Sequence, residues 1–311
     1  MGTIVVMTDW NTTNIPDQTG RFAIVTGTGG LGFETALELA SRGAEVVLAG
    51  RNAEKGAQSV RRILAESPEA KIRFEELDLA SLASIATFAT RMAATHSRLD
   101  ILVNNAGVMT PPARRTTADG FELQFGTNHL GHFALTARLL PLLRAAGAAR
   151  VTTVSSGMHR IGRINFDDLQ FEKSYRPIAA YGQSKLANLM FALELQRRSD
   201  AKGWGLLSDA AHPGFALTDL IANGPGTKGL NYQASRFLAL FLAHSPAEGA
   251  LPTLFAATSP YAVPGGYYGP KGTFELIGAP GPAHASKRSR DKAVAARLWD
   301  VSEQLTGVTF P

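Results

Sequence analysis

The sequence predicts an α/β fold in which one doubly wound parallel sheet carries helices on both faces. Four short apolar runs, each typical of a buried strand, alternate with helical patterns in the first part of the chain. The first run leads into a glycine-rich turn at Gly27–Gly32, and the other three lead into polar residues. Parallel strands joined by helices need right-handed crossovers, and such sheets bind their ligands at the carboxyl ends of the strands.

Composition and charge limit the kinds of protein that this chain can be. Its 311 residues are 45% hydrophobic, which suffices for a large core, and they include no cysteine, which excludes disulfides and thiolate metal sites. The net charge is +5, but the Lys and Arg residues are scattered among acidic residues, so we expect no nucleic-acid partner. The longest apolar run, Phe237–Ala243, is far shorter than the roughly 18 residues needed to span a bilayer. We therefore expect a soluble, cytoplasmic protein without a secretory signal or transmembrane segment.

We expect a single domain over residues 21–311, preceded by a polar, turn-prone arm at residues 1–20. The first strand, Phe22–Thr26, leads through the glycine turn into a helical pattern. Glycines let the backbone approach a pyrophosphate, and the start of a helix offers free N–H groups and a positive dipole end. Strand, glycine turn and helix in this order predict a dinucleotide site.

The end of the second strand bears on the choice of cofactor. This strand, Ala44–Ala49, is followed by Gly50, Arg51 and Asn52. An acidic residue here would bind a free ribose 2′-hydroxyl, whereas Arg51 offers a guanidinium fork suited to a 2′-phosphate. The pattern favours NADP over NAD, although Arg51 could also be an ordinary surface arginine.

Two further strand–helix units complete this half of the sheet. Their expected bounds are Glu54–Glu66 and Leu82–Thr95 for the helices and Ile72–Leu77 and Leu99–Val103 for the strands. The strands lead into Asp78 and into Asn104-Asn105-Ala106-Gly107. Because the carboxyl ends of parallel strands share one edge, Gly27, Asn52, Asp78 and Asn105 should converge there.

The segment that begins at Asp119 is expected to open a long helix, which runs to about Leu143. Asn128 lies within it, and a buried amide in a packed helix must be hydrogen-bonded to avoid a large cost. His129 and His132 follow, but no carboxylate accompanies them at ligand spacing, so we interpret both as packed or capping residues and expect no metal site.

Tyr181 and Lys185 are the central candidates for chemistry. The fifth strand, Val151–Val154, delivers Ser155 and Ser156 to the same edge, and a helix is expected from Tyr181 to about Arg198. Residues four apart share a helix face, and an ammonium near a phenol should lower a pKa that is ordinarily about 10. Tyr and Lys at this spacing also occur on solvated faces, so the pair gains meaning only from its context.

The remaining third of the chain is less regular. The expected elements are a strand at Leu206–Ala211, a small helical substrate lid at about 215–245, a strand at Gly266–Tyr268, a loop at 269–282 and a helix at Lys292–Leu305. The lid segment could equally be an ordinary packing or dimer helix. Asp209 lies within a central strand, where a carboxylate needs a partner that the sequence does not identify.

Taken together, the chain resembles the short-chain dehydrogenase/reductase family over about residues 20–270. The residues that carry the resemblance are the glycine turn after Thr26, Asp78, Asn104–Gly107, Asn128, Ser155-Ser156, Tyr181-Gly-Gln-Ser-Lys185 and Pro213-Gly214. The segment Phe125–Phe133 and the long interval from Ser156 to Tyr181, with His159-Arg160, are similar to the retinol dehydrogenase-like and protochlorophyllide reductase-like branch. The resemblance implies a Rossmann fold and an NADP(H)-dependent carbonyl/alcohol oxidoreductase.

The resemblance also implies roles for individual residues. Tyr181 would be the general acid or base, Lys185 would lower its pKa and bind the nicotinamide ribose, Ser156 would hold the substrate oxygen, and Asn128 would fix a water linking Lys185 to solvent. The implied cofactor contacts, besides Tyr181 and Lys185, are Gly27, Thr28, Gly30, Leu31, Gly32, Arg51, Asn52, Asp78, Leu79, Asn105, Ala106, Gly107, Pro213, Gly214 and Thr218. The family also suggests a homo-oligomer, either a dimer or a tetramer.

Two departures from the family pattern stand out. Only Thr28 and Gly29 separate Gly27 from Gly30, so the glycine turn is one residue shorter than usual and contributes no basic residue to a 2′-phosphate site. Asp209 stands where the branch usually has an apolar or aromatic residue.

Two other functions compete with the oxidoreductase. A regulator of the same fold could sense NADP(H) without chemistry, although all four catalytic positions hold competent residues. A serine hydrolase using Ser156 and His159 would lack both a nucleophile-elbow sequence and a defined acid. The apolar run in the lid segment indicates a bulky lipophilic carbonyl or alcohol as substrate.

Overall fold

The computed structural model describes residues 10–214 and 245–311, and its centre is one eight-stranded sheet. The strand order is β3-β2-β1-β4-β5-β6-β7-β8, with the first seven strands parallel and β8 antiparallel to β7. The strands are β1 (Phe22–Thr26), β2 (Glu45–Gly50), β3 (Lys71–Glu76), β4 (Ile101–Asn104), β5 (Arg150–Val154), β6 (Leu207–Ala211), β7 (Tyr267–Pro270) and β8 (Pro280–Pro282). The predicted doubly wound α/β fold is confirmed.

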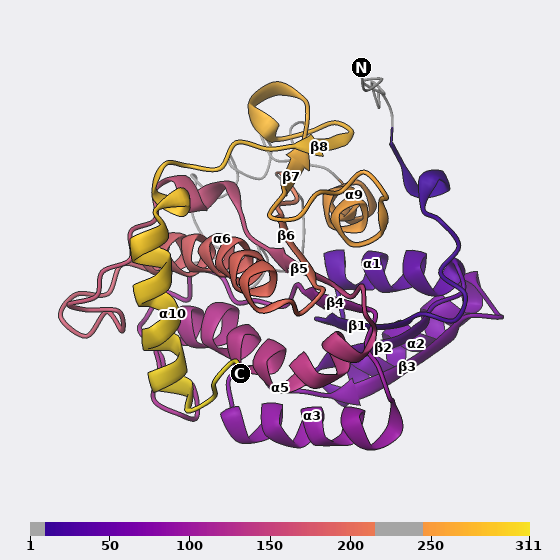
Figure 1. The fold of residues 1–311 in the computed structure, drawn as a ribbon, viewed down its shortest axis with the longest axis horizontal. Coiled ribbons are helices and arrows are strands. Elements are labelled where there is room, and N and C mark those ends of the chain that lie inside the picture. The colour runs from indigo at the N-terminus through magenta and orange to yellow at the C-terminus, as the bar shows by residue number, and fades with distance from the viewer. Residues whose placement is uncertain (1–9, 215–244) are drawn as a thin grey trace.

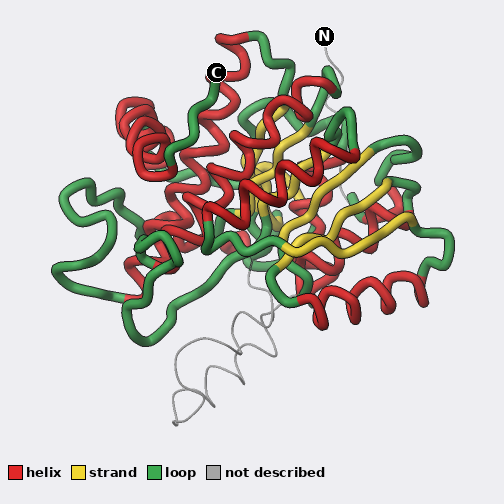
Figure 2. Tube along the Cα trace, turned by 90° about the horizontal axis from the view of Figure 1, so that it is seen from below, coloured by secondary structure: helices red, strands yellow, loops and turns green. Residues whose placement is uncertain are grey.

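Helices cover both faces of the sheet (Figure 1). They are α1 (Gly30–Ser41), α2 (Ala53–Glu66), α3 (Leu82–Thr95), α4 (Leu123–Phe125), α5 (Gly131–Ala145), α6 (Pro177–Lys202), α9 (Pro246–Thr258) and α10 (Lys292–Thr306). α1, α2 and α9 pack on one face, and α3, α5 and α6 pack on the other, where α10 lies against α5 and α6. Figure 2 shows the twisted band of strands between the two helical layers.

Local sequence explains where several helices begin and end. The Asn52 and Ser81 side chains cap α2 and α3 by accepting backbone N–H groups of the first turn. Pro177 occupies the start of α6, where a missing N–H costs nothing, and Gly203 ends the helix with φ of 63°. α6 thus begins one turn before Tyr181, earlier than the sequence predicted.

Two further segments differ from the expected elements. The stretch 269–282 is not loop throughout, because Pro280–Pro282 pairs with β7 as β8. Residues 10–20 are no free arm, because Trp10 and Ile15 are buried and Trp10 packs edge-on against Phe255 of α9 with ring centres 5.3 Å apart. Apolar contacts therefore attach this part of the expected arm to the α1–α9 face.

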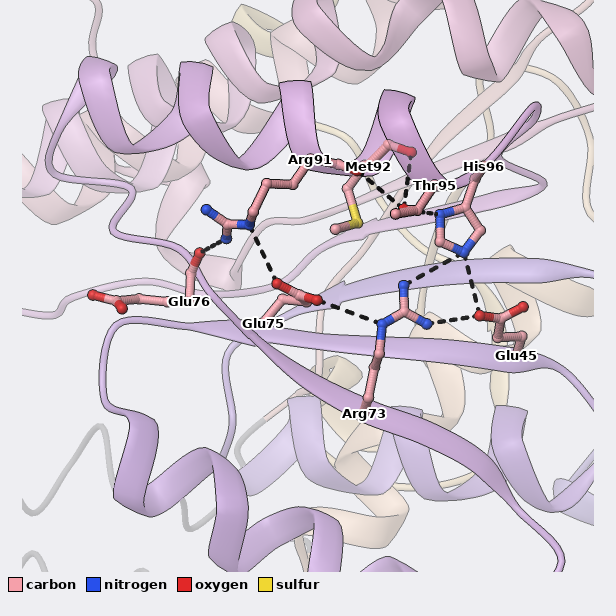
Figure 3. A network of polar contacts seen from close by, with 8 residues as sticks. All are labelled: Glu45, Arg73, Glu75, Glu76, Arg91, Met92, Thr95 and His96. Carbon is pink, nitrogen blue, oxygen red and sulfur yellow. Dashed lines mark hydrogen bonds and ion pairs between the residues drawn. The ribbon is translucent and has the colours of Figure 1, made fainter.

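A polar network joins the outer strands to α3 (Figure 3). Arg73 of β3 lies 2.7 Å from Glu45 of β2 and 3.5 Å from Glu75, which Arg91 of α3 also contacts at 3.3 Å. His96, just after α3, lies 3.2 Å from Glu45. These side chains are partly exposed, so each ion pair adds little to the stability of the fold. Glu45 lies at the amino end of β2, opposite to the carboxyl edge where the sequence places the site.

Candidate active site

Tyr181 and Ser156 meet at the carboxyl end of β5. Tyr181, one turn into α6, is only 6% exposed. Ser156 follows β5 and caps the short 3-10 turn Gly157–Arg160 by accepting the N–H of Met158 at 3.2 Å. The Ser156 hydroxyl lies close enough to the Tyr181 phenol to act on its pKa. The two residues predicted to act on the substrate oxygen are thus adjacent.

Burial raises the pKa of Tyr181 to about 12, and the nearby Ser156 hydroxyl offsets only part of this effect. The direction is opposite to the lowering that the Tyr–Lys spacing suggested. The reason is geometric, because Lys185 Nζ lies 5.8 Å from the centre of the Tyr181 ring while the phenol is withdrawn from water. Tyr181 is therefore a protonated phenol at neutral pH.

Lys185 is a buried ammonium with spare hydrogen-bonding capacity. It is 3% exposed, and burial lowers its pKa to about 8. Its Nζ donates to Val154 O at 3.1 Å, which is its one acceptor within the described residues. An ammonium has three N–H donors, so two remain for the oxygens of a ligand. This is the behaviour expected of a residue that binds ribose hydroxyls.

Asn128 sits in a π-helical turn, Gly126–Leu130, immediately before α5. Its Nδ2 donates to Val108 O at 2.9 Å and to Ser184 Oγ at 3.0 Å, and its Oδ1 accepts the Val108 N–H at 2.7 Å. The amide is thus fully bonded, as a buried side chain in a helix requires. A Cβ placed on Gly107 would lie 3.0 Å from Asn128 Oδ1 and 3.8 Å from Lys185 Nζ. The segment that follows β4 therefore lies directly beside both side chains.

His132 connects this region to the end of β1. Its Nδ1 lies 2.9 Å from Asn128 O, which can only accept, so Nδ1 carries the proton and Nε2 accepts from Thr26 Oγ1 at 2.9 Å. Thr26 Oγ1 in turn accepts the N–H groups of Asn105 and Ala106, both at 2.9 Å. His132 is therefore a packed, neutral residue that aligns three segments of the site, and the sequence alone did not reveal this role.

The other histidine of the pair is also packed. His129 is buried, and its Nε2 lies 3.0 Å from Ser302 Oγ of α10. Among residues 10–214 and 245–311, no three His, Asp or Glu side chains are grouped closely enough to hold a metal ion.

The glycine turn forms a backbone cradle at the start of α1. A Cβ on Gly32 would lie 2.1 Å from Gly27 O and one on Gly27 would lie 2.9 Å from Asn105 Nδ2, so neither position admits a side chain. Gly27 also has φ of 95°, in the left-handed region. No side chain caps α1, whose first N–H groups are left for an anion. The shortened turn thus still presents what a pyrophosphate needs.

The residues expected around the adenosine end lie along the same edge. Arg51, just after β2, is exposed and pairs with no acidic side chain in the described parts of the chain. Asn52 Oδ1 accepts the Lys55 N–H at 2.9 Å as the cap of α2, so a structural role accounts for this residue. Asp78 Oδ1 accepts the Ala80 N–H at 2.9 Å, and Leu79 is buried.

The residues expected at the nicotinamide end are only partly described. Pro213 and Gly214 follow β6 on the same edge as Ser156. Thr218 and the expected lid at 215–245 lie outside the described residues, apart from Ser245.

The serine hydrolase hypothesis does not fit the geometry. His159 Nδ1 donates to the backbone oxygen of Ser156 at 2.7 Å, and Nε2 accepts the Ser286 N–H at 3.3 Å. Both ring nitrogens are thus used by the backbone, and neither serves as a base for the Ser156 hydroxyl.

Comparison with known proteins identifies the family. The model of the short chain dehydrogenase family matches residues 21–227. The chain belongs to this family. It is 43% identical to polyprenol dehydrogenase of Mus musculus over 300 residues, covering 94% of this chain and 86% of that protein. It is 42% identical to human retinol dehydrogenase 13 over 297 residues, with the same coverages of 94% and 86%.

Solved structures give the same result. A crystal structure of a putative uncharacterized protein from Mycobacterium paratuberculosis matches with a TM-score of 0.81 and 41% identity, covering 98% of this chain and 100% of that one. A putative short chain dehydrogenase of Shigella flexneri, complexed with NADP, matches with a TM-score of 0.63 and 25% identity, covering 81% and 97%. This chain is therefore an oxidoreductase of the short-chain dehydrogenase/reductase family, in the retinol dehydrogenase-like branch. In its described residues, no helix is both long and apolar enough to cross a membrane.

Proposed function

We propose that this protein is an NADP(H)-dependent oxidoreductase that interconverts a carbonyl and an alcohol on a bulky lipophilic substrate. The observation that carries the proposal is the buried group in which the Tyr181 phenol lies beside the Ser156 hydroxyl and the Lys185 ammonium keeps spare donors beside Gly107. Such perturbed, converging groups at the carboxyl edge of a parallel sheet are typical of an active site.

The proton would come from Tyr181. When bound, NADPH would supply a hydride to the carbonyl carbon of the substrate. Ser156 Oγ would hold the carbonyl oxygen, and the phenol of Tyr181 would donate its proton to that oxygen to give the alcohol. A phenol whose pKa is raised to about 12 is protonated at neutral pH, as a proton donor in carbonyl reduction has to be. Solvent would then return a proton to Tyr181.

NADP(H) is favoured over NAD(H) by charge at the end of β2. Arg51 is exposed there, and no acidic residue stands in its place to repel a 2′-phosphate. Two solved relatives, from Shigella flexneri and Escherichia coli CFT073, are described as complexed with NADP and NADPH. Gly27, Gly32 and the uncapped start of α1 would hold the pyrophosphate, and Lys185 the nicotinamide ribose.

The substrate class rests on relatives and on exposed apolar side chains. Polyprenol and retinol, in the names of the relatives, are long lipophilic alcohols. On this chain, Ile161 and Phe274 are 58% and 81% exposed, and they precede or follow in sequence the two residues of the Arg160–Glu275 ion pair. A lipophilic substrate would cover such exposed apolar side chains. A cytoplasmic location and a homodimer or homotetramer stay predictions.

A cofactor-dependent activity screen tests the proposal. NADPH and NADH would each be offered with short polar, aromatic and long-chain carbonyls, and absorbance of the reduced cofactor would be followed at 340 nm, the standard wavelength. We expect turnover with NADPH and the highest kcat/KM for long-chain or aromatic carbonyls. Tight NADPH binding with no turnover on any carbonyl would favour the regulator instead, and turnover only on small polar carbonyls would contradict the substrate class.

A further inference from the structure

The loop between β7 and β8, residues 271–279, is held in an unusual backbone conformation. Gly272 N–H donates to Ile277 O at 2.8 Å, which closes the loop. At its tip, Phe274 and Glu275 have φ of 54° and 59°, in the left-handed region that side chains rarely adopt. Two such residues in succession persist only where their surroundings fix them, and such sites often serve a function.

The Glu275 carboxylate provides the contacts that fix the loop. Its Oε2 lies 2.5 Å from a guanidinium nitrogen of Arg160 and 3.2 Å from Nε2 of His212, although the imidazole is not aligned as a hydrogen-bond donor. Its Oε1 accepts the N–H of His284 at 2.8 Å. One side chain on this loop thus contacts three separate segments of the chain.

Two of these segments carry the candidate site. Arg160 belongs to the 3-10 turn that Ser156 caps. His212 follows β6, and its Nδ1 accepts the N–H of Gly214, the last described residue of the nicotinamide end, at 3.2 Å. Because Nδ1 accepts, the proton of the neutral imidazole is on Nε2, the nitrogen that faces Glu275.

The backbone of the loop also rests directly on Gly214. A Cβ at Gly214 would lie 2.2 Å from Leu276 O and 2.7 Å from Pro270 Cγ, and Gly214 has φ of 69°. Similarly, a Cβ at Gly269 would lie 2.0 Å from His212 Nε2. The β7–β8 loop and the segment 212–214 are thus packed without room for a side chain between them.

We propose that Glu275 is a positioning residue for the hydride-transfer reaction, because its ion pair with Arg160 ties the Ser156 turn to the β7–β8 loop, whose backbone packs against Gly214 at the nicotinamide end. This inference rests on the proposed function, and it assigns a role to Glu275, whose hydrogen bonds within the described residues reach neither Tyr181 nor Lys185. A displacement of about 1 Å between reacting groups lowers an enzymatic rate by up to about 100-fold, so a clamp of this kind acts on kcat.

A structural role alone would give a different result. Arg160 and Glu275 are 39% and 21% exposed, and partly exposed ion pairs add little to global stability. The matched control is Glu45, which forms an ion pair of 2.7 Å with Arg73 and is 43% exposed, but stands at the amino end of β2. Glu275→Gln and Glu45→Gln remove the same charge and should lower the melting temperature by similarly small amounts.

The first measurement compares NADPH-dependent carbonyl reduction by these two variants with that of the wild type. For Glu275→Gln we expect kcat to fall about tenfold or more, little change in KM for the carbonyl, and a larger primary isotope effect with deuterated NADPH because hydride transfer becomes slower. Glu45→Gln should match the wild type. A Glu275→Gln enzyme with wild-type kcat and isotope effect would overturn the proposal.

The second measurement does not need turnover, so it separates this proposal from the proposed function. Amide hydrogen exchange followed by mass spectrometry should show faster exchange at 156–161 and at 211–214 in Glu275→Gln but not in Glu45→Gln. Faster exchange confined to 271–284 would refute the clamp. If the wild type reduces no carbonyl with NADPH, the proposed function fails, and hydrogen exchange alone decides whether Glu275 joins the two segments.

A double variant tests whether Arg160 acts through the same contact. Arg160→Gln should resemble Glu275→Gln, and combining the two should reduce kcat no further than the worse single variant, because only one contact is lost. Additive losses in kcat would show that the two side chains act separately and would contradict the proposed clamp.

Discussion

Asp209 offers a sharp test of the electrostatics of the core. This carboxylate is fully buried in β6, where Oδ1 accepts from Thr152 Oγ1 at 2.7 Å and Oδ2 has no partner among the described residues. Burial raises the pKa of Asp209 from 3.8 to about 7, although Thr152 and Arg150 both act to lower it. The perturbation is Asp209→Asn, which keeps the shape of the side chain and removes its charge.

The sign of the effect follows from the raised pKa. Between about pH 4 and pH 7 the unfolded chain loses the Asp209 proton while the folded protein keeps it, so the free energy of unfolding falls as the pH rises. One pKa unit corresponds to about 1.4 kcal/mol, so the loss is on the order of 2 kcal/mol at pH 5 and 4 kcal/mol at pH 8. Asparagine does not titrate, so its free energy of unfolding does not fall in this way. The difference in free energy of unfolding between the variant and the wild type should therefore rise by about 2 to 3 kcal/mol from pH 5 to pH 8.

Urea denaturation at pH 5 and pH 8 measures this difference. Asp300→Asn is the matched control, because Asp300 is 65% exposed and its substitution should have the same effect at both pH values. The reasoning is refuted if the stability difference between Asp209→Asn and the wild type does not change between pH 5 and pH 8.

Three further predictions follow from the site. Burial lowers the pKa of His129 to about 3 and of His132 to about 4, so both resist protonation in the folded state and stability should fall as the pH drops from about 6.5 towards 4. Acid denaturation followed by circular dichroism should therefore have a lower midpoint pH in a His129→Gln variant, and an unchanged midpoint would contradict the assigned pKa. Gly32→Ala puts a Cβ against Gly27 O and should weaken NADPH binding by about tenfold or more, which is about 1.4 kcal/mol per factor of ten. Fluorescence titration measures this affinity, and an unchanged affinity would mean that the pyrophosphate lies elsewhere. Arg51→Glu should shift the ratio of kcat/KM values from NADPH towards NADH, and an unchanged ratio would show that another residue reads the phosphate.

The sequence predicted the sheet well because strand, turn and helix signals agree along the first 200 residues. The buried run at Phe22–Thr26 and the glycine turn after it form β1 and the start of α1 as expected. The misses are local. The Gly- and Pro-rich composition of 269–282 predicts a loop, yet Pro280–Pro282 forms a strand at the edge of the sheet, a position that tolerates proline. α9 was overlooked although Ser245 and Glu248 form a capping box with Pro246 between them, a signal that was present in the sequence.

The sequence indicates candidate site residues but not their electrostatics. Tyr181 and Lys185 are one helical turn apart, as their spacing required, but spacing does not reveal that burial dominates the pKa of the phenol. The contacts of Glu275 with Arg160 and His212 each span more than 60 residues in sequence, and no local pattern predicts such contacts. Asp209 gained its partner in Thr152 only through the pairing of β5 with β6.

The most direct test of the central claim is Tyr181→Phe, with Tyr175→Phe as the control. Burial raises the pKa of both tyrosines to about 12, but Tyr175 donates to Pro111 O, away from Ser156. If Tyr181 is the proton donor, Tyr181→Phe should lower kcat for NADPH-dependent carbonyl reduction by about 10² to 10⁴-fold while NADPH still binds. Tyr175→Phe should keep its activity. Wild-type turnover in Tyr181→Phe would contradict the account.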